Sequence, residues 1–135
     1  MVTTEDVRRL ASTLPRSYEV LVRDRVKFRV GSIVWLAFSR DETILGFAFP
    51  KEEREALVES DPKTYLMPPE SDLRFNWVML RLDRIDAKEM REIVLDAWRM
   101  VVPKFAYRAY LESQQGIDSD TLADDAPSDP GDPAE

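Results

Sequence analysis

Residues 23–38 read Arg23-Asp-Arg-Val-Lys-Phe-Arg-Val-Gly-Ser-Ile-Val-Trp-Leu-Ala-Phe38. The pattern predicts two strands joined by a turn at Gly31-Ser32. In the first strand, three apolar residues alternate with three cations, which are Arg25, Lys27 and Arg29. Because successive side chains of a strand point to opposite faces, we expect one apolar face and one face with three cations about 7 Å apart. The second strand is apolar on both faces, which is typical of the centre of a sheet.

Further elements are predicted on both sides of this hairpin from apolar residues at helical spacing and from β-branched and aromatic runs. The helices are residues 3–14, 51–59, 86–102 and 104–111, and the other strands are residues 17–23, 43–49 and 75–82. Short connections between consecutive strands favour antiparallel pairing. The fold class is therefore α+β, with a single antiparallel sheet and helices packed mainly on one face, in the order α-β-β-β-α-β-α. The other face is expected to be open to water or to a partner.

The chain has 135 residues and contains neither cysteine nor histidine. This composition excludes disulfides, Cys/His zinc sites, Cys nucleophiles and catalytic triads that need His. No glycine-rich phosphate loop or dinucleotide fingerprint is present. The acidic residues near Asp41 and on residues 51–59 are expected to be solvated. The sequence therefore predicts a protein that is not an enzyme and has no cofactor, metal site or small-molecule substrate.

Charge is distributed unevenly along the chain. The formal net charge is −7, but residues 116–135 contain seven acidic residues and no Lys or Arg, so residues 1–115 are formally neutral. We expect residues 1–115 to form a single domain and residues 116–135 a disordered acidic tail. The tail is either inert or competes with a polyanion for the basic face. There is no apolar run of 18 residues and no export signal, so a cytoplasmic location is expected and a membrane partner is not.

The basic strand is the candidate binding site. Its cations and two neighbours can contact phosphates, and the set is Arg23, Arg25, Lys27, Arg29 and Arg40. The alternative is that these charges only keep an exposed strand soluble and prevent edge pairing. Among the tryptophans, Trp35 and Trp98 are expected in the core. Trp77 is the one for which base stacking is considered.

A set of motifs resembles the MmcQ/YjbR family, and within it the actinobacterial branch, over residues 4–111. The motifs are the basic strand from Arg23 to Gly31, then Ala37–Thr43, Gly46–Leu57, Ser71–Val78 and Asp96–Lys104. The resemblance implies a compact CyaY-like (frataxin-like) α+β fold and DNA binding through a double wing of β-hairpins. The matching wing candidates are the turns at Gly31-Ser32 and Arg40-Asp41-Glu42. The family supplies no catalytic residues, and the first helix lacks the acidic ridge that iron binding would need.

Two functions are favoured by the sequence, and an enzyme that acts on an unrecognised substrate is a third class that stays open. The first is a small non-enzymatic DNA-binding protein that contacts phosphates without sequence preference through the basic β-hairpin face. The second is a protein–protein interaction module or a homodimer, which would use the open sheet face or the flank formed by Leu95 and Val102.

Overall fold

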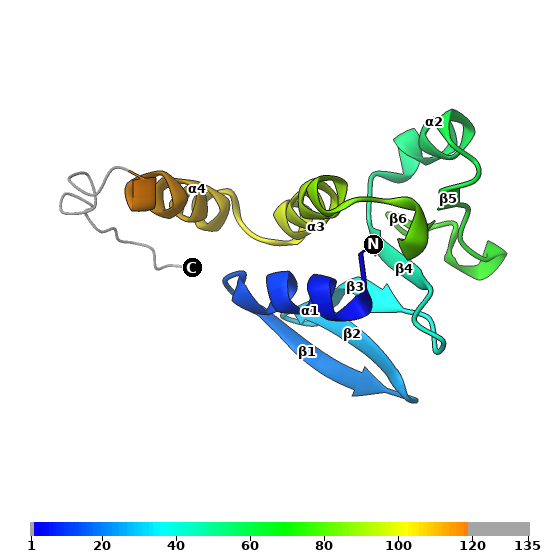
Figure 1. The fold of residues 1–135 in the computed structure, drawn as a ribbon, viewed down its shortest axis with the longest axis horizontal. Helices are drawn as coiled ribbons and strands as arrows, with labels where there is room; N and C mark the ends of the chain where they lie inside the picture. The colour runs from blue at the N-terminus through cyan, green and yellow to red at the C-terminus, as the bar shows by residue number, and fades with distance from the viewer. Residues whose placement is uncertain (1, 119–135) are drawn as a thin grey trace. The chain divides into compact units, whose positions relative to one another are not determined.

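The computed structural model describes residues 2–118, and the predicted acidic tail beyond Asp118 lies outside the described residues. Six strands form one antiparallel sheet in the order β1-β2-β3-β4-β6-β5 (Figure 1). The strands are β1 (Ser17–Val22), β2 (Arg25–Val30), β3 (Ile33–Phe38), β4 (Ile44–Ala48), β5 (Tyr65–Leu66) and β6 (Trp77–Arg81). The helices are α1 (Thr4–Thr13), α2 (Lys51–Ser60), α3 (Ala87–Val101) and α4 (Lys104–Asp118), with short 3₁₀ turns η1 (Glu70–Asp72) and η2 (Leu82–Arg84). The α+β class with a single antiparallel sheet is as predicted.

The observed order of elements contains more strands than the predicted order. Four strands precede α2, as the predicted residue ranges have it although the order α-β-β-β-α-β-α counts only three, and the short β5 pairs with β6. β5 has only two residues and lies in a proline-rich segment, where the sequence suggests no more than a short edge segment at Tyr65-Leu66-Met67. α4 continues past the predicted end at 111 to Asp118. No helix in the described part of the chain is both long and apolar enough to cross a membrane.

Two compact units divide the chain after Val101. The first contains the sheet with α1, α2 and α3. The described part of the second is α4. The prediction of one domain over residues 1–115 stays a prediction, and everything below concerns the first unit.

Tight turns set the register of the first three strands. Arg23 and Asp24 have φ angles of 53° and 68°, which match the hairpin turn that requires two positive φ values. The turn between β2 and β3 uses Gly31, with φ of 61°. β2 pairs with β3 in register except at a bulge after Phe28, where Trp35 has no partner. Trp35 is fully buried and meets the Phe28 ring edge-on, at 6.3 Å between centroids, so the bulge accommodates a large core side chain.

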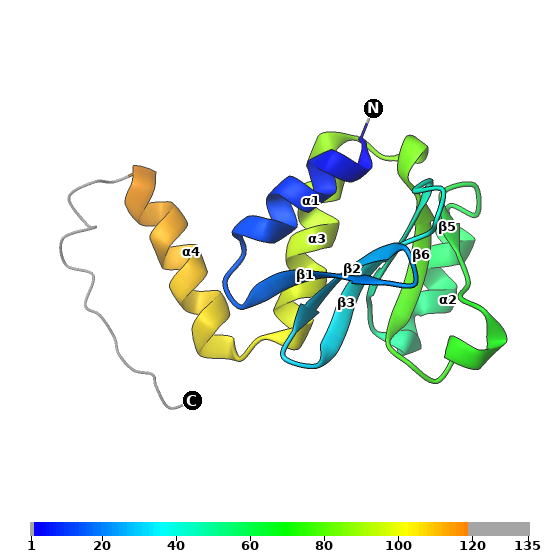
Figure 2. The ribbon, with the colours of Figure 1, turned by 90° about the horizontal axis from the view of Figure 1, so that it is seen from below.

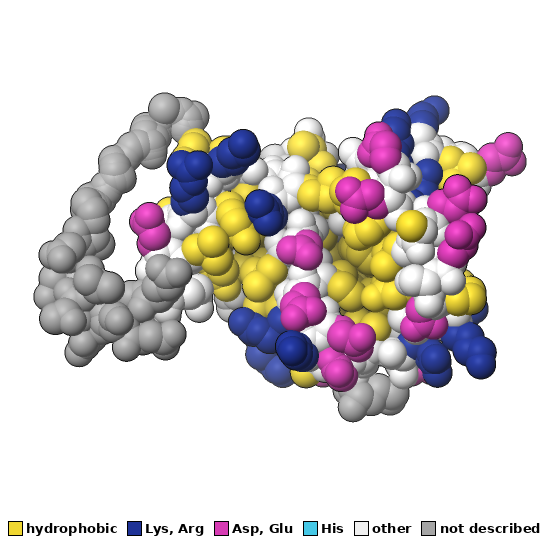
Figure 3. Space-filling view, turned by 90° about the horizontal axis from the view of Figure 1, so that it is seen from above, with side chains coloured by type: hydrophobic (Ala, Val, Ile, Leu, Met, Phe, Trp, Pro, Cys, Tyr) yellow, Lys and Arg dark blue, Asp and Glu magenta, His cyan; other side chains and the backbone are white. Residues whose placement is uncertain are grey.

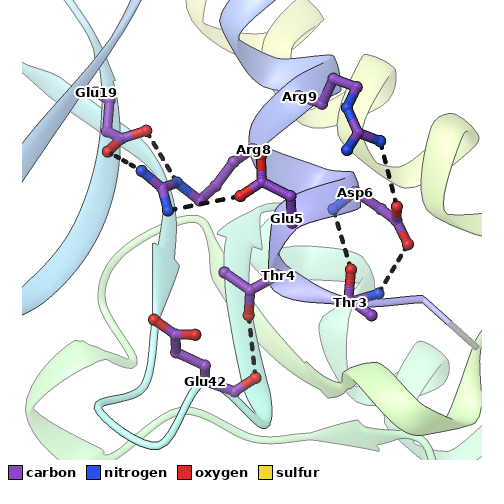
Figure 4. A network of polar contacts seen from close by, with 8 residues as sticks. All are labelled: Thr3, Thr4, Glu5, Asp6, Arg8, Arg9, Glu19 and Glu42. Atoms are coloured by element: carbon purple, nitrogen blue, oxygen red, sulfur yellow. Dashed lines mark hydrogen bonds and ion pairs between the residues drawn. The ribbon is translucent and has the colours of Figure 1, made fainter.

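Helices α1 and α3 cover one face of the sheet (Figures 1 and 2). Arg8 of α1 forms a bidentate pair with Glu19 of β1, at 2.7 and 3.1 Å, and Glu19 lies opposite Phe28 in register. Figure 4 shows this pair together with the capping box at the start of α1. The side chain of Trp98 in α3 donates a hydrogen bond from Nε1 to the carbonyl oxygen of Pro15, at 2.9 Å. The Phe28 face is therefore the covered face, and Trp98 belongs to the core as predicted.

Candidate functional site

The face opposite the helices carries the cations of β2. We call it the open face, and Arg25, Lys27 and Arg29 the cation row. Since Phe28 faces the helices, these three residues point away from them. All three are half-buried, and Arg25 donates from Nε to the carbonyl oxygen of Phe38 at 3.0 Å. The alternation predicted from the sequence is thus present in the strand.

No ion pair found in residues 2–118 involves the cation row, whereas Arg8 pairs with Glu5 and Glu19. Arg29 even has a buried Nε without a hydrogen-bond partner among the described residues. The buried Nε of Arg29 is itself out of reach of solvent, but a charged side chain without an ion pair can still bind an outside anion through the nitrogens that it exposes. The cation row therefore has unused capacity to bind anions.

The pKa of Lys27 reflects the positive charge around it. Burial is the largest cause that lowers the pKa of its ammonium group below the usual value. The nearby cations lower this pKa further, in the order Arg25, Arg29 and Arg23, whereas Asp72 raises it. Arg23 in the β1–β2 turn is therefore close enough to act with the row. Together these charges produce a positive potential that a bound anion would relieve.

A cavity of about 630 Å³ opens beside the cation row, entirely within the first unit. Its lining combines two cations, small and apolar residues of the sheet, the segment before and at the start of β6, and the last turn of α3. These residues are Arg25, Lys27, Ile33, Val34, Ala37, Ala48, Asp72, Phe75, Asn76, Trp77, Met100 and Val101. Ala37 and Ala48 have short side chains on β3 and β4, the two strands that separate β2 from β6. The cavity exists because the small side chains of Ala37 and Ala48 lie between the long cations of β2 and the aromatic residues at the start of β6.

Trp77 lies over Gly46 on the side of the cavity away from the cations. A Cβ atom at Gly46 would be only 2.6 Å from Cζ2 of Trp77. Only glycine therefore allows the indole to rest on β4. A glycine inside a strand is typical of a place where another group comes close, and at Gly46 that group is the side chain of Trp77.

Arg54 of α2 stabilises the segment that forms the far side of the cavity. We call this segment the outer wall, and its cavity-lining residues are Asp72, Phe75, Asn76 and Trp77. Arg54 of α2 is only 6% exposed. Its guanidinium donates to the carbonyl oxygens of Phe75 at 3.0 Å, of Trp77 at 2.9 Å and of Leu73 at 2.7 Å. Asn76 adds a bond, because its Oδ1 accepts from the backbone of Lys51 at 3.0 Å. The outer wall is thus fixed by these polar contacts together with the pairing of Trp77 with Ala48 of β4.

Sequence reasoning missed the outer wall and Arg54. Asp72 lies in the proline-rich segment 61–74, where no local pattern predicts a place at a cavity. A signal for Arg54 was present, since it is the single arginine among three glutamates at positions 52–55. Its burial, however, depends on the backbone of residues 73–77, which no local pattern reveals.

Arg40 is separated from the cation row. It is exposed in the β3–β4 turn, whereas the cation row lies within β2. Its turn borders a second cavity of about 470 Å³, whose acidic lining residues are Glu5, Asp41, Glu42 and Asp83. Four carboxylates around this turn offset the charge of Arg40.

The two turns expected to act as wings are not neighbours. The Gly31-Ser32 turn precedes β3 and the Arg40-Asp41-Glu42 turn follows it, so they lie at opposite ends of that strand. The turn at the same end as Arg40 is the one at Arg23-Asp24, because antiparallel β2 begins where β3 finishes. A pair of wings on one side of the molecule would therefore use the β1–β2 and β3–β4 hairpins.

Comparisons with known proteins concern the same part of the chain. A family model described as YjbR matches residues 12–100. The crystal structure of Deinococcus radiodurans protein DR2400, whose family-model domain is DUF419, is similar with a TM-score of 0.65 and 22% sequence identity. The alignment covers 75% of this chain and 79% of that one, and it shows a common fold. No curated protein matches the chain.

Proposed function

The chain belongs to the YjbR family, and from the charges of its open face we propose that it is a non-enzymatic DNA-binding protein. In this proposal, Arg23 and the cation row contact phosphates. The observation that carries it is the concentration of four cations on and beside β2, with no ion pair to the row among the described residues. Phosphate contacts position a protein on DNA without reading sequence, so binding without sequence preference is expected.

Four phosphate contacts would make binding strongly dependent on salt. Each neutralised phosphate contributes about 0.9 to the slope of log affinity against log salt, so the expected slope is about −3.6 for duplex DNA. Arg40 contributes less in this proposal, because its neighbours are acidic. DNA is encountered in the cytoplasm of a bacterium, and the cytoplasmic location expected from the sequence is part of the proposal.

The test is fluorescence anisotropy with a labelled random-sequence duplex at 50 and 200 mM salt. Charge reversal with Arg23→Glu and Lys27→Glu together should abolish binding at 200 mM salt and weaken it at least ten-fold at 50 mM. The matched control is Lys88→Glu with Arg91→Glu, two exposed cations of α3 on the covered side. On that side, Lys and Arg are interspersed with Asp and Glu (Figure 3). Equal losses in both double variants would show only a net-charge effect and would contradict the proposed site.

A protein–protein interaction module or homodimer is the second candidate. Exposed apolar residues favour it, since Ile33 is 53% and Phe75 49% exposed at the rim of the cavity. Hydrophobic side chains also gather on the helix side between α3 and α2 (Figure 3). Light scattering distinguishes the candidates: self-association that Phe75→Ser abolishes, with no DNA binding at 50 mM salt, would favour this second function.

A further inference from the structure

The cavity has cations on one side and an aromatic ring on the other, at a fixed separation. Lys27, Ala37 and Gly46 are register partners on β2, β3 and β4. Neighbouring strands are about 4.8 Å apart, so the backbones at Lys27 and Gly46 are about 10 Å apart. Trp77 rests on Gly46. The indole and the ammonium group therefore face each other across Ala37, over a span comparable to that of one nucleotide.

The space between them is sufficient for a ligand of that size. The cavity of about 630 Å³ lies within the range of about 300–1,000 Å³ that is typical of small-molecule sites. Phosphates on the surface of a duplex need no such hollow. A nucleobase, by contrast, can enter it only when it is unpaired and free to turn out of its strand.

The chemistry of the lining matches the parts of a nucleotide. An indole such as Trp77 stacks on any base, and Phe75, 49% exposed, offers a second ring at the rim. Lys27 and Arg25 suit a phosphate. Asp72 would repel a simple anion, but it can accept a hydrogen bond from the amino group of a base or from a sugar hydroxyl. The lining thus favours a ligand with an anionic end, a flat ring and a hydrogen-bond donor.

We propose that the cavity holds one unpaired nucleotide, with its base against Trp77, its phosphate beside Lys27 and Arg25, and a donor group near Asp72. The protein would then bind single-stranded nucleic acid in preference to duplex. This inference rests on the proposed function, since it uses the same open face. It adds a base-binding element to the phosphate contacts and names the form of nucleic acid.

Anisotropy compares a labelled 12-nucleotide single strand of mixed sequence with the duplex of the same sequence at equal salt. We expect tighter binding of the single strand. Trp77→Ala should weaken it by between about 5- and 150-fold, the range for loss of one stacked base. Trp77→Phe, which keeps a ring, should restore most of the affinity. The matched control is Leu21→Ala, which removes an apolar side chain that is 70% exposed and lies in register with Val26, away from the cavity.

Two further measurements remain decisive if Trp77→Ala does not fold. Trp35 and Trp98 are fully buried, so quenching of intrinsic fluorescence by the strand should report Trp77 and disappear in Trp77→Phe. Gly46→Ala should also weaken single-strand binding, because the added methyl group displaces the indole while leaving every cation in place.

The outcomes separate the two proposals. Equal binding of strand and duplex, with Trp77→Ala no more harmful than Leu21→Ala, would overturn the nucleotide site and leave DNA binding intact. Absence of binding to either at 50 mM salt would overturn the proposed function as well. Quenching by free AMP without binding of the strand would overturn the assignment to nucleic acid and point to a mononucleotide as the ligand.

Discussion

Arg54 is the residue whose loss should damage the site most without touching a ligand. Its three bonds go to backbone carbonyls of residues 73–77, and it is 6% exposed. We predict that Arg54→Ala lowers the free energy of unfolding by about 2–4 kcal/mol, because hydrogen bonds to charged groups are strong and the carbonyls lose their donor. Arg54→Lys should not restore stability, since an ammonium group cannot reproduce the planar fork.

Urea denaturation measures this effect. The control is Arg91→Ala on the exposed side of α3, for which a change within about 0.5 kcal/mol is expected. If Arg54→Ala is as stable as the control, the outer wall is not held by the guanidinium, and the account of the site loses its support.

Lys27 should make stability depend on pH. Its pKa is lowered in the folded protein, mainly by burial, from an ordinary value near 10.5. The unfolded chain therefore binds a proton more tightly at this position, and folding is favoured as the pH rises from below the lowered pKa toward 10.5. We predict that the wild type gains stability relative to Lys27→Gln between pH 7 and pH 10, as measured by urea midpoints. The difference between the two proteins removes the contributions of the other titratable groups. A constant difference over this range would show that the pKa of Lys27 is not lowered.

Residue-level sequence reasoning succeeded where a local pattern carries the information. The alternation of Arg25, Lys27 and Arg29 with apolar residues predicted their common face, and a glycine inside a strand, such as Gly46, is typical of a close approach. It did not identify Trp77 as the approaching side chain, because Gly46 and Trp77 meet only through the pairing of β4 with β6. The acidic surroundings of Arg40 had no local signal for a similar reason, since the acidic residues around its turn come partly from α1 and η2, and a role for Arg40 at the site stays a prediction.

Among the elements, the hairpin turns allow the clearest predictions of how a substitution changes the free energy of unfolding. Asp24 has φ of 68°, a conformation that glycine adopts without strain, so Asp24→Gly should stabilise the protein by about 0.5–1 kcal/mol. Gly31→Ala should destabilise it by about 1–2 kcal/mol through backbone strain alone, because no heavy atom lies within 4 Å of an added Cβ.

The stabilities of the two variants are compared by their midpoints of urea unfolding. Each variant is a control for the other, because Asp24 lies in the β1–β2 turn and Gly31 in the adjacent β2–β3 turn. A stabilising Gly31→Ala would contradict the positive φ assigned to this turn. Neither substitution removes a cation, so DNA affinity should change little in either protein.

The elements themselves were largely predictable, whereas their irregularities were not. Apolar stripes located α1 and α3, and the structure adds reciprocal hydrogen bonds between Asp86 and Glu89 at the start of α3. The bulge at Trp35 had no signal, because an apolar run is equally compatible with regular pairing. The family resemblance read from the motifs is confirmed by the YjbR match over residues 12–100, while the double wing that the resemblance implies stays a prediction.

For the whole molecule, the distribution of charge predicts an effect of the C-terminal residues on binding. Residues 119–135 contain six acidic and no basic residues, so their removal changes the formal net charge from −7 to −1. We predict that a chain ending at Asp118 binds DNA several-fold more tightly at 50 mM salt, because fewer negative charges oppose the approach of a polyanion. The difference should diminish at 200 mM salt.

A matched variant separates charge from length. Replacing the six acids by Asn and Gln keeps all 135 residues, and it should bind as tightly as the truncated chain. If only truncation strengthens binding, the effect is steric. If neither does, the tail is inert toward DNA, which was the alternative that the sequence left open.

The salt dependence of DNA binding by the full-length wild type tests the central claim most directly. If Arg23 and the cation row contact phosphates, log affinity for a duplex should fall with log salt at a slope of about −3.6, a loss of roughly 100-fold between 50 and 200 mM. Arg23→Glu with Lys27→Glu should at least halve this slope. A slope near zero, or no binding at 50 mM salt, would contradict the assignment of the open face to nucleic acid.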